Sequence, residues 1–243
     1  ETLYYQPEHT GFSHLYVQKP DEAPIALTSG RFIVDDLTLS HDDNYIYFKA
    51  NMEHPGLYEV YRADLTDNTI DTMTDLNGMT DYSLSPDGKN LLLSHSKVNK
   101  PQELYIKPAN ETSAAKQITQ STSADFNALP WAVPNIVAIE SSHTEAPIYA
   151  RVYLPENYDK SAPNKAVVFN HGAGYLQNAH MGWSGYFREY MFHSMLVQQG
   201  YVVLDMDYRA SAGYGRDWRT AIYRQMGTPE VQDLRDGVNW LVE

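Results

Sequence analysis

The stretch of this chain whose residue types could do chemistry is His-Gly-Ala-Gly, at residues 171–174. It follows a short apolar run at residues 165–170, which predicts a strand that ends at the loop. Small residues after a strand allow the backbone to approach a ligand closely, so that its N–H groups can stabilise a negatively charged oxygen. We therefore predict an oxyanion-binding loop made of His171, Gly172, Ala173 and Gly174.

Two other interpretations of this loop are open. A dinucleotide fingerprint would need a third glycine at position 177, which is Gln177, and a helix that begins at once. A tight strand-to-helix turn without a chemical role also fits the residues. The oxyanion interpretation is preferred because His-Gly-Gly-Gly-like loops of α/β-hydrolases donate an N–H to the tetrahedral oxyanion, and the residue after the nucleophile donates the second.

The nucleophile for such a loop is not evident. The elbow pattern Gly-x-Ser-x-Gly is absent, and the nearest strings are GWSG at residues 182–185 and RASAG at residues 209–213. The first is one residue short, and the second has an arginine where strand and helix must approach closely. We expect Ser184 to begin or cap a helix, and Ser211 is a poor candidate for the nucleophile.

Metal and cofactor chemistry has little support in the sequence. The nine histidines form no His-Glu-x-x-His pattern, no P-loop is present, and the chain has no cysteine. Disulfides, thiolate metal sites and cysteine nucleophiles are thereby excluded. The carboxylate-rich stretch HDDN at residues 41–44 is expected to be a turn. We predict no metal site and no cofactor.

The composition limits the partners. Lys plus Arg number 18 and Asp plus Glu 31, so the net charge of −13 argues against a nucleic-acid partner. No apolar run of about 18 residues is present, so we predict no membrane span. The Asn-x-Thr sequon at residues 110–112 is interpreted as a chance match. The chain begins at Glu1 without a basic and then apolar leader, which leaves the compartment open.

The first 130 residues contain short β segments that recur along the chain. Leu-Tyr pairs stand at positions 15, 57 and 104, threonines at 28, 74 and 119, and the turns SHDDN and SPDGK begin at 40 and 85. A period in the forties with several short strands per unit is typical of propeller blades. Two full units and part of a third fit, whereas a closed propeller needs at least four.

After residue 130 the pattern changes to strands that alternate with helices. A hairpin is predicted over residues 136–154, apolar strands over 165–170 and 201–207, and helices over 183–199 and from Thr228 onward. This order indicates an α/β domain with a parallel sheet. The residues expected on the helices' apolar faces are Phe187, Tyr190, Met191 and Met195 in the first, and Val231, Leu234, Val238 and Leu241 in the second.

Residues 169–227 resemble the first part of the catalytic domain of prolyl oligopeptidase-family serine peptidases. The similar subgroup contains dipeptidyl peptidase IV-like and acylaminoacyl peptidase-like enzymes. The most specific portion is DYR at 207–209, with S-x-G-Y-G at 211–215 and the segment around Trp218. The blade-like repeats of the first 130 residues fit this resemblance in their general pattern, because that family has a propeller before its α/β-hydrolase domain.

The resemblance implies incomplete β-propeller blades at residues 1–130 and the N-terminal part of an α/β-hydrolase domain at residues 131–243. It implies a serine peptidase that hydrolyses short peptides through an acyl-enzyme, with the Ser, Asp and His of the triad expected C-terminal to Glu243. On this interpretation the 243-residue chain alone is inactive.

The resemblance carries over only the oxyanion loop. His171 stands where dipeptidyl peptidase IV-like members have a tyrosine hydroxyl, and in the acylaminoacyl-like arrangement the donor would be the N–H of Ala173. His171 would orient the loop, while Gly172 and Gly174 would let it approach the substrate.

Two rival functions are open: an esterase or lipase of the His-Gly-Gly-Gly type, and a non-catalytic propeller–hydrolase binding module. The expected partners are peptide substrates, with neither nucleic acid nor membrane, and a homo-oligomer is compatible with the sequence. The preferred side chain of the substrate and the choice between exo- and endopeptidase cleavage cannot be decided from the residues.

Overall fold

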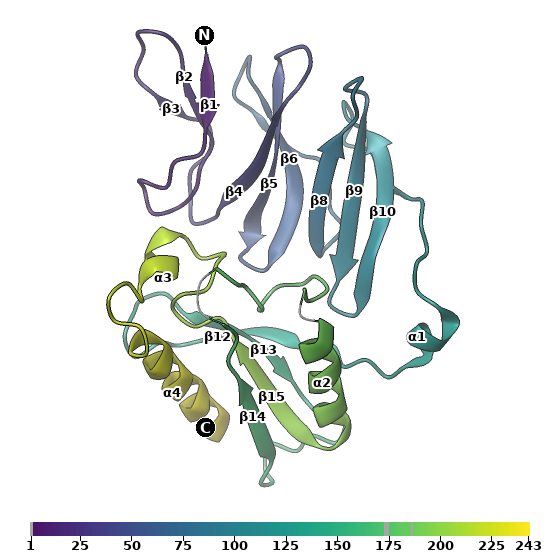
Figure 1. The fold of residues 1–243 in the computed structure, drawn as a ribbon, viewed down its shortest axis with the longest axis vertical. Helices are drawn as coiled ribbons and strands as arrows, with labels where there is room; N and C mark the ends of the chain where they lie inside the picture. Colours follow the sequence, from purple (N-terminus) through teal and green to yellow (C-terminus); the bar gives the residue numbers. More distant parts are fainter. Residues whose placement is uncertain (1, 173–174, 186) are drawn as a thin grey trace.

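The computed structural model describes residues 2–172, 175–185 and 187–243. Two β-sheets occupy the first half of the chain and stand side by side above a third sheet that carries helices (Figure 1). The strands of the first two sheets are β1 (Leu3–Tyr5), β2 (Tyr16–Gln18), β3 (Ile25–Ala26), β4 (Val34–Leu39), β5 (Tyr45–His54), β6 (Leu57–Asp64), β7 (Ile70–Thr72), β8 (Met79–Leu84), β9 (Asn90–Lys97), β10 (Lys100–Pro108) and β11 (Lys116–Gln117).

The second half begins after the short helix α1 (Ala124–Ala128), which lies in the connection between the two regions. The remaining elements are β12 (Asn135–Ile139), β13 (Ile148–Tyr153), β14 (Lys165–Phe169), α2 (Phe187–Gln198), β15 (Tyr201–Met206), α3 (Arg216–Thr220) and α4 (Pro229–Val242). The predicted hairpin, both apolar strands and both long helices are therefore present.

The first half consists of short antiparallel units. Strands β1 to β3 form one sheet, while β4 to β7 and β8 to β11 form two antiparallel meanders joined by a single parallel pair between Tyr58 and Met79. The prediction of two full units and part of a third is confirmed at this level.

In each unit the recurring threonine forms a hydrogen bond with the backbone of an earlier residue in the same unit. Its side-chain oxygen accepts the backbone N–H of a strand residue 13 to 15 positions earlier, at 2.8–2.9 Å. The pairs are Leu15 N–H with Thr28, Val60 N–H with Thr74, and Leu104 N–H with Thr119. In the last two units the same hydroxyl donates to a glutamate, Glu59 or Glu103.

The recurring turns have a common hydrogen-bond pattern as well. Ser40 Oγ donates to Asp42, and Ser85 Oγ donates to Asp87, both at 2.6 Å. Gly88 takes the left-handed conformation that the turn requires, with φ +70°. The carboxylate-rich stretch at residues 41–44 is thus a turn, as predicted.

Strand β5 packs against a neighbour on each face. Ile46 and Phe48 point into a core shared with Leu15, while Tyr47, between them, joins the core formed with Leu91 of β9. Alternation along a strand sends successive side chains to opposite faces. Strand β5 therefore contributes side chains to a core on each of its faces.

The sheet of the second half has the order β12-β13-β15-β14, with helices on both faces (Figure 1). Strands β14 and β15 are parallel, and their register pairs Phe169 with Asp205. Helix α2 contacts β15 and β13, whereas α4 packs on the core that contains Leu204 and Met206. The parallel pairing brings the carboxyl ends of β14 and β15 to one edge of the sheet.

The first long helix differs from its prediction. Helix α2 begins at Phe187 rather than at 183, because the backbone N–H groups of Met181 and Trp183 bind Gly56 O and Ser96 Oγ in the first half. Met195, expected on the apolar face, is exposed. Tyr190, which was expected on that face, is buried together with His193, Ser194 and Val197.

The second long helix has its predicted apolar face in part, since Leu234 and Leu241 pack against the core of the sheet. Thr228 is its N-cap residue and Pro229 lies in the first turn, as predicted. However, Val231 and Val238 are about half exposed, at 51% and 46%. Gly237 lies against Met206 instead, since the helix approaches the sheet where it has no side chain.

The recurring threonine yields a matched pair of stability predictions. Thr74→Val leaves the buried Val60 N–H without an acceptor and should lower the free energy of unfolding by about 1–3 kcal/mol. Thr119→Val removes the same bond at an exposed position, where water replaces it, and should cost less than about 0.5 kcal/mol. Urea unfolding of both variants measures this, and equal losses would contradict it.

Candidate active site

The predicted loop starts where two strands end together. His171 follows β14 by two residues and Asp207 follows β15 at the equivalent position, since Phe169 pairs with Asp205. The described parts of the loop between β14 and α2, residues 170–172 and 175–185, then cross the top of the sheet beneath the β5–β6 hairpin (Figure 1). Both side chains are almost fully buried.

Asp207 is the centre of the hydrogen bonds that hold this loop. Its Oδ1 accepts from the backbone N–H of Asn178 at 2.7 Å, and its Oδ2 accepts from the N–H of Ala179 at 3.0 Å. Tyr214 Oη donates to Oδ2 at 2.6 Å, and His171 Nε2 lies 3.1 Å from Oδ1. One buried carboxylate therefore connects the beginning of the loop, its middle and the segment after β15.

The surroundings of His171 favour its charged form. Its Nδ1 lies 2.9 Å from Gly172 O and its Nε2 3.1 Å from Asp207 Oδ1, and both oxygens can only accept hydrogen bonds. Burial disfavours the imidazolium, but the hydrogen bond to Asp207 and its negative charge outweigh that effect and raise the pKa of His171. The Tyr208 ring stacks on the imidazole at 4.7 Å, and its hydroxyl donates to His171 O.

Ser211 meets this pair without forming a catalytic triad. Its Oγ lies 3.1 Å from His171 Nε2, the same nitrogen that faces Asp207, whereas a triad histidine uses one ring nitrogen for the serine and the other for the aspartate. The Ser211 hydroxyl donates to Tyr208 O at 2.7 Å, and the side chain is fully buried. It therefore serves to position His171 and is not placed to attack a substrate.

The other predicted residues lie along the same loop. Gly172 is exposed, and Ser184 is buried three residues before Phe187, where α2 begins. Ala173 and Gly174 lie outside the described residues, so the prediction that the Ala173 N–H binds an oxyanion stays a prediction.

A second layer of buried polar groups supports the loop from below. Arg151 donates through Nε and Nη2 to His180 O and through Nη2 to Gly182 O, the latter at 2.9 Å. Asp205, its cross-strand partner, accepts from Asn178 Nδ2 at 3.1 and 3.2 Å. Burial raises the pKa of Asp205 to about 7, while the Arg151 charge acts in the opposite direction.

Arg209, two residues after Asp207, forms an ion pair with helix α4. Arg209 Nη2 lies 2.8 Å from Asp233 Oδ1, and Asp233 is fully buried in α4. The backbone N–H of Arg209 also donates to Asp233 at 2.7 Å. This pair ties the segment that follows Asp207 to the helix packed below it.

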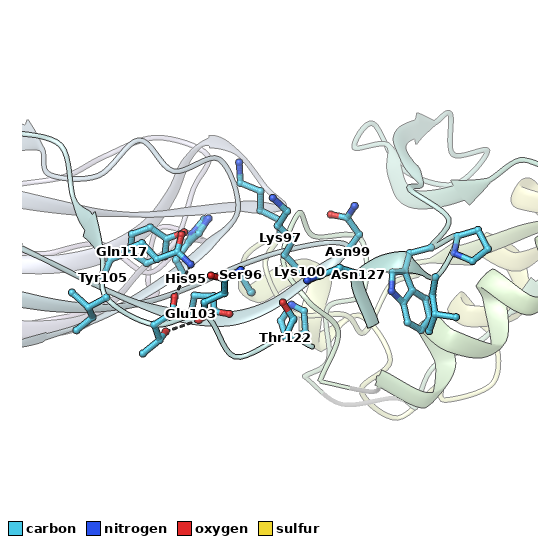
Figure 2. A pocket seen from close by; sticks show the side chains of 17 residues that line it. His95, Ser96, Lys97, Asn99, Lys100, Glu103, Tyr105, Gln117, Thr122 and Asn127 are labelled. Carbon is cyan, nitrogen blue, oxygen red and sulfur yellow. Dashed lines mark hydrogen bonds between the residues drawn. The ribbon is translucent and has the colours of Figure 1, made fainter. Parts of the chain in front are cut away.

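The cavity shown in Figure 2 lies elsewhere. It has a volume of about 1020 Å³ and is lined by residues of β9 and β10, including His95 and Glu103, and by the connection around Trp131. None of the predicted site residues lines it. It follows the outer edge of the second sheet rather than the carboxyl edge of the third.

The described part of the chain offers neither a metal cluster nor a membrane helix. In residues 2–172, 175–185 and 187–243, no three His, Asp or Glu side chains are grouped so that they could hold a metal ion. Over the same residues, every helix is too short or too polar to span a bilayer.

Sequence reasoning did not assign a role to Asp207, although it quoted the motif that contains it. The available signal was an acidic residue directly after a continuous apolar strand, at the end where loops of a parallel sheet meet. Its partners Asn178 and Tyr214 carry no comparable signal, since their roles depend on the path of the loop.

Comparison with known proteins supports the resemblance. The family profile of the dipeptidyl peptidase IV N-terminal region matches residues 1–102, and that of the prolyl oligopeptidase family matches residues 187–243. The chain is 25% identical to a probable dipeptidyl-aminopeptidase B of Talaromyces marneffei and 24% identical to dipeptidyl peptidase 4 of Trichophyton equinum. These matches cover 93% and 92% of this chain, but only 25% and 29% of the relatives.

The fold comparison agrees with the sequence comparison. The crystal structure of Porphyromonas gingivalis dipeptidyl peptidase 4 superposes with a TM-score of 0.84 at 18% identity, over 98% of this chain and 33% of that one. The chain thus spans about a quarter to a third of the length of the proteins that it matches. Together these matches show that the chain is similar to a fragment of dipeptidyl peptidase IV-like members of the prolyl oligopeptidase family.

Proposed function

We propose that the complete protein is a serine-type peptidase that hydrolyses short peptides through an acyl-enzyme. In this proposal residues 1–130 are blades of a β-propeller, and residues 131–243 are the N-terminal part of an α/β-hydrolase domain. The observation that carries the proposal is the Asp207 centre, which fixes the loop after His171 at the carboxyl edge of β14 and β15. Ligands of open α/β sheets bind at that edge.

The role proposed for the loop is stabilisation of the oxyanion. When a serine oxygen attacks the peptide carbonyl, the C=O bond opens and the oxygen gains negative charge. The Ala173 N–H is proposed to donate to that oxygen, with a second N–H from the residue after the nucleophile. His171, which is buried and bonded to Asp207, would hold the strand end from which this loop departs.

The nucleophile, its aspartate and its histidine are proposed to lie in the part of the parent protein C-terminal to Glu243. The geometry of Ser211 supports this, because its hydroxyl is buried and bonded to Tyr208 O. Peptides are the proposed substrates because the relatives are named dipeptidyl peptidases and aminopeptidases. The removal of dipeptides from the amino terminus is the cleavage mode that those names suggest.

The proposed function is tested on the complete parent protein with a fluorophosphonate probe and two substrate panels, dipeptidyl anilides and simple esters. We expect covalent labelling of one serine outside residues 1–243 and turnover of the anilides. Labelling with ester turnover alone would favour the esterase, whereas no labelling would favour the non-catalytic binding module.

The oxyanion role is tested by Ala173→Pro in the same protein. Loss of the N–H should lower kcat by about 10²–10³-fold, the effect of removing one oxyanion donor, with a much smaller change in KM. Ala173→Ser keeps the N–H and serves as the control. If Ala173→Pro turned over substrate like the wild type, the loop would not be the oxyanion site.

The raised pKa of His171 yields a pH prediction. Its pKa is raised in the folded protein, so the His171–Asp207 pair contributes its full stability below the unfolded value of about 6.5 and loses it as pH rises through the folded pKa. The advantage in free energy of unfolding of the wild type over His171→Gln should therefore shrink between pH 6 and 9. Chemical unfolding across that range measures it, and an advantage that grew with pH would contradict the charged imidazole.

A further inference from the structure

The β14–α2 loop is held from a second side, by the turn of the β5–β6 hairpin. This turn consists of Pro55 and Gly56, between His54 and Leu57, which close the hairpin. The backbone N–H of Met181 donates to Gly56 O at 2.7 Å. A side chain at Gly56 would collide with the backbone oxygen of Ala179, so turn and loop are in direct backbone contact.

Gln177 provides the side-chain part of this contact. Its Nε2 donates to Pro55 O at 2.8 Å, and its Oε1 accepts from Tyr58 Oη at 2.6 Å. Both functions of the amide are therefore used by residues of the hairpin, while Gln177 itself belongs to the loop. Tyr58 is buried, so water does not readily replace its hydroxyl.

The hairpin also contacts the segment after β15. Asn51 Nδ2 donates to Gly213 O at 2.9 Å and to Pro55 O at 3.0 Å. Gly213 has φ +98°, and a Cβ there would collide with the Gln177 side chain. The amide of Gln177 thus fits between the hairpin turn and the backbone of this segment.

The two sets of contacts meet on consecutive residues. The N–H groups of Asn178 and Ala179 are bound by Asp207 from the α/β side, while Gln177 and Met181 are bound by the hairpin from the other side. We infer that Gln177 is a positioning residue through which the β5–β6 hairpin sets the shape of the β14–α2 loop. The inference rests on the proposed function of that loop.

The consequence for turnover follows from geometry. A displacement of about 1 Å in a catalytic group can cost about 10²-fold in rate, even when the change is made at a distance. Loss of the Gln177 contacts should therefore lower kcat, because stabilisation of the oxyanion depends on the exact position of the proposed N–H donor. Substrate binding away from the loop should be little affected, so KM should stay within about threefold.

The first experiment uses Gln177→Ala and Tyr58→Phe, singly and together, in the complete parent protein. Each single variant should lower kcat about 10-fold or more, and the double variant should be no worse than the poorer single one, since both remove the same bond. Gln198→Ala is the matched control: its Nε2 also donates to a proline carbonyl, Pro130 O at 3.2 Å, but it stands on α2 away from the hairpin. Independent, multiplying losses, or an equal loss in Gln198→Ala, would overturn the inference.

The second experiment does not depend on activity. Hydrogen exchange of the amides of Asn178, Ala179 and Met181 reports directly whether the loop opens. Exchange should accelerate about 10-fold or more in Gln177→Ala and also in Gly56→Ala, whose new methyl group on the hairpin turn would collide with the backbone oxygen of Ala179. Gly185→Ala, with open space around the new methyl group, should leave it unchanged.

The two readouts separate the inference from the proposed function. If the wild type hydrolyses no peptide or ester, the proposed function fails, and the exchange rates still decide whether the hairpin positions the loop. If the wild type is active while Gln177→Ala keeps both its kcat and its amide protection, the function stands and the inference is wrong.

Discussion

The structure depends on a carboxylate buried at the end of a strand. An ionised Asp207 without partners in the interior would be strongly destabilising, so its surroundings must supply donors. They do so from three directions: the imidazole of His171, the backbone of Asn178 and Ala179, and the hydroxyl of Tyr214. The requirement to satisfy one charge thereby determines the path of the loop that is the candidate for catalysis.

The α/β region and the sheets above it both form hydrogen bonds with this loop. Asp207 and Arg151 bind it from below, while the hairpin turn at Pro55 and Gly56 binds it from above. Most of these bonds end on backbone groups, which a loop cannot leave unpaired in the interior. The loop between β14 and α2 thus has little secondary structure of its own and still has a defined conformation over its described residues.

Much of the fold could be predicted because its signals are local. The apolar runs of β14 and β15, the turns at Ser40 and Ser85 and the period of Thr28, Thr74 and Thr119 all depend on near neighbours in the sequence. The start of α2 and the exposed faces of Met195 and Val238 could not be predicted, because tertiary contacts decide them. For the site, the position of His171 was predicted, but its pairing with Asp207 depends on the register of two strands 36 residues apart in the sequence.

The alternation along β5 has a consequence for how this protein can change. Ile46 and Phe48 belong to the core that contains Leu15, and Tyr47 belongs to the core that contains Leu91, so both faces of the strand are buried. Insertion or deletion of a single codon within the strand would exchange the two sets and place every following side chain in the wrong interface. Length variation among natural homologues should accordingly be confined to the turn before Tyr45, while the strand itself tolerates only replacement by residues of similar shape.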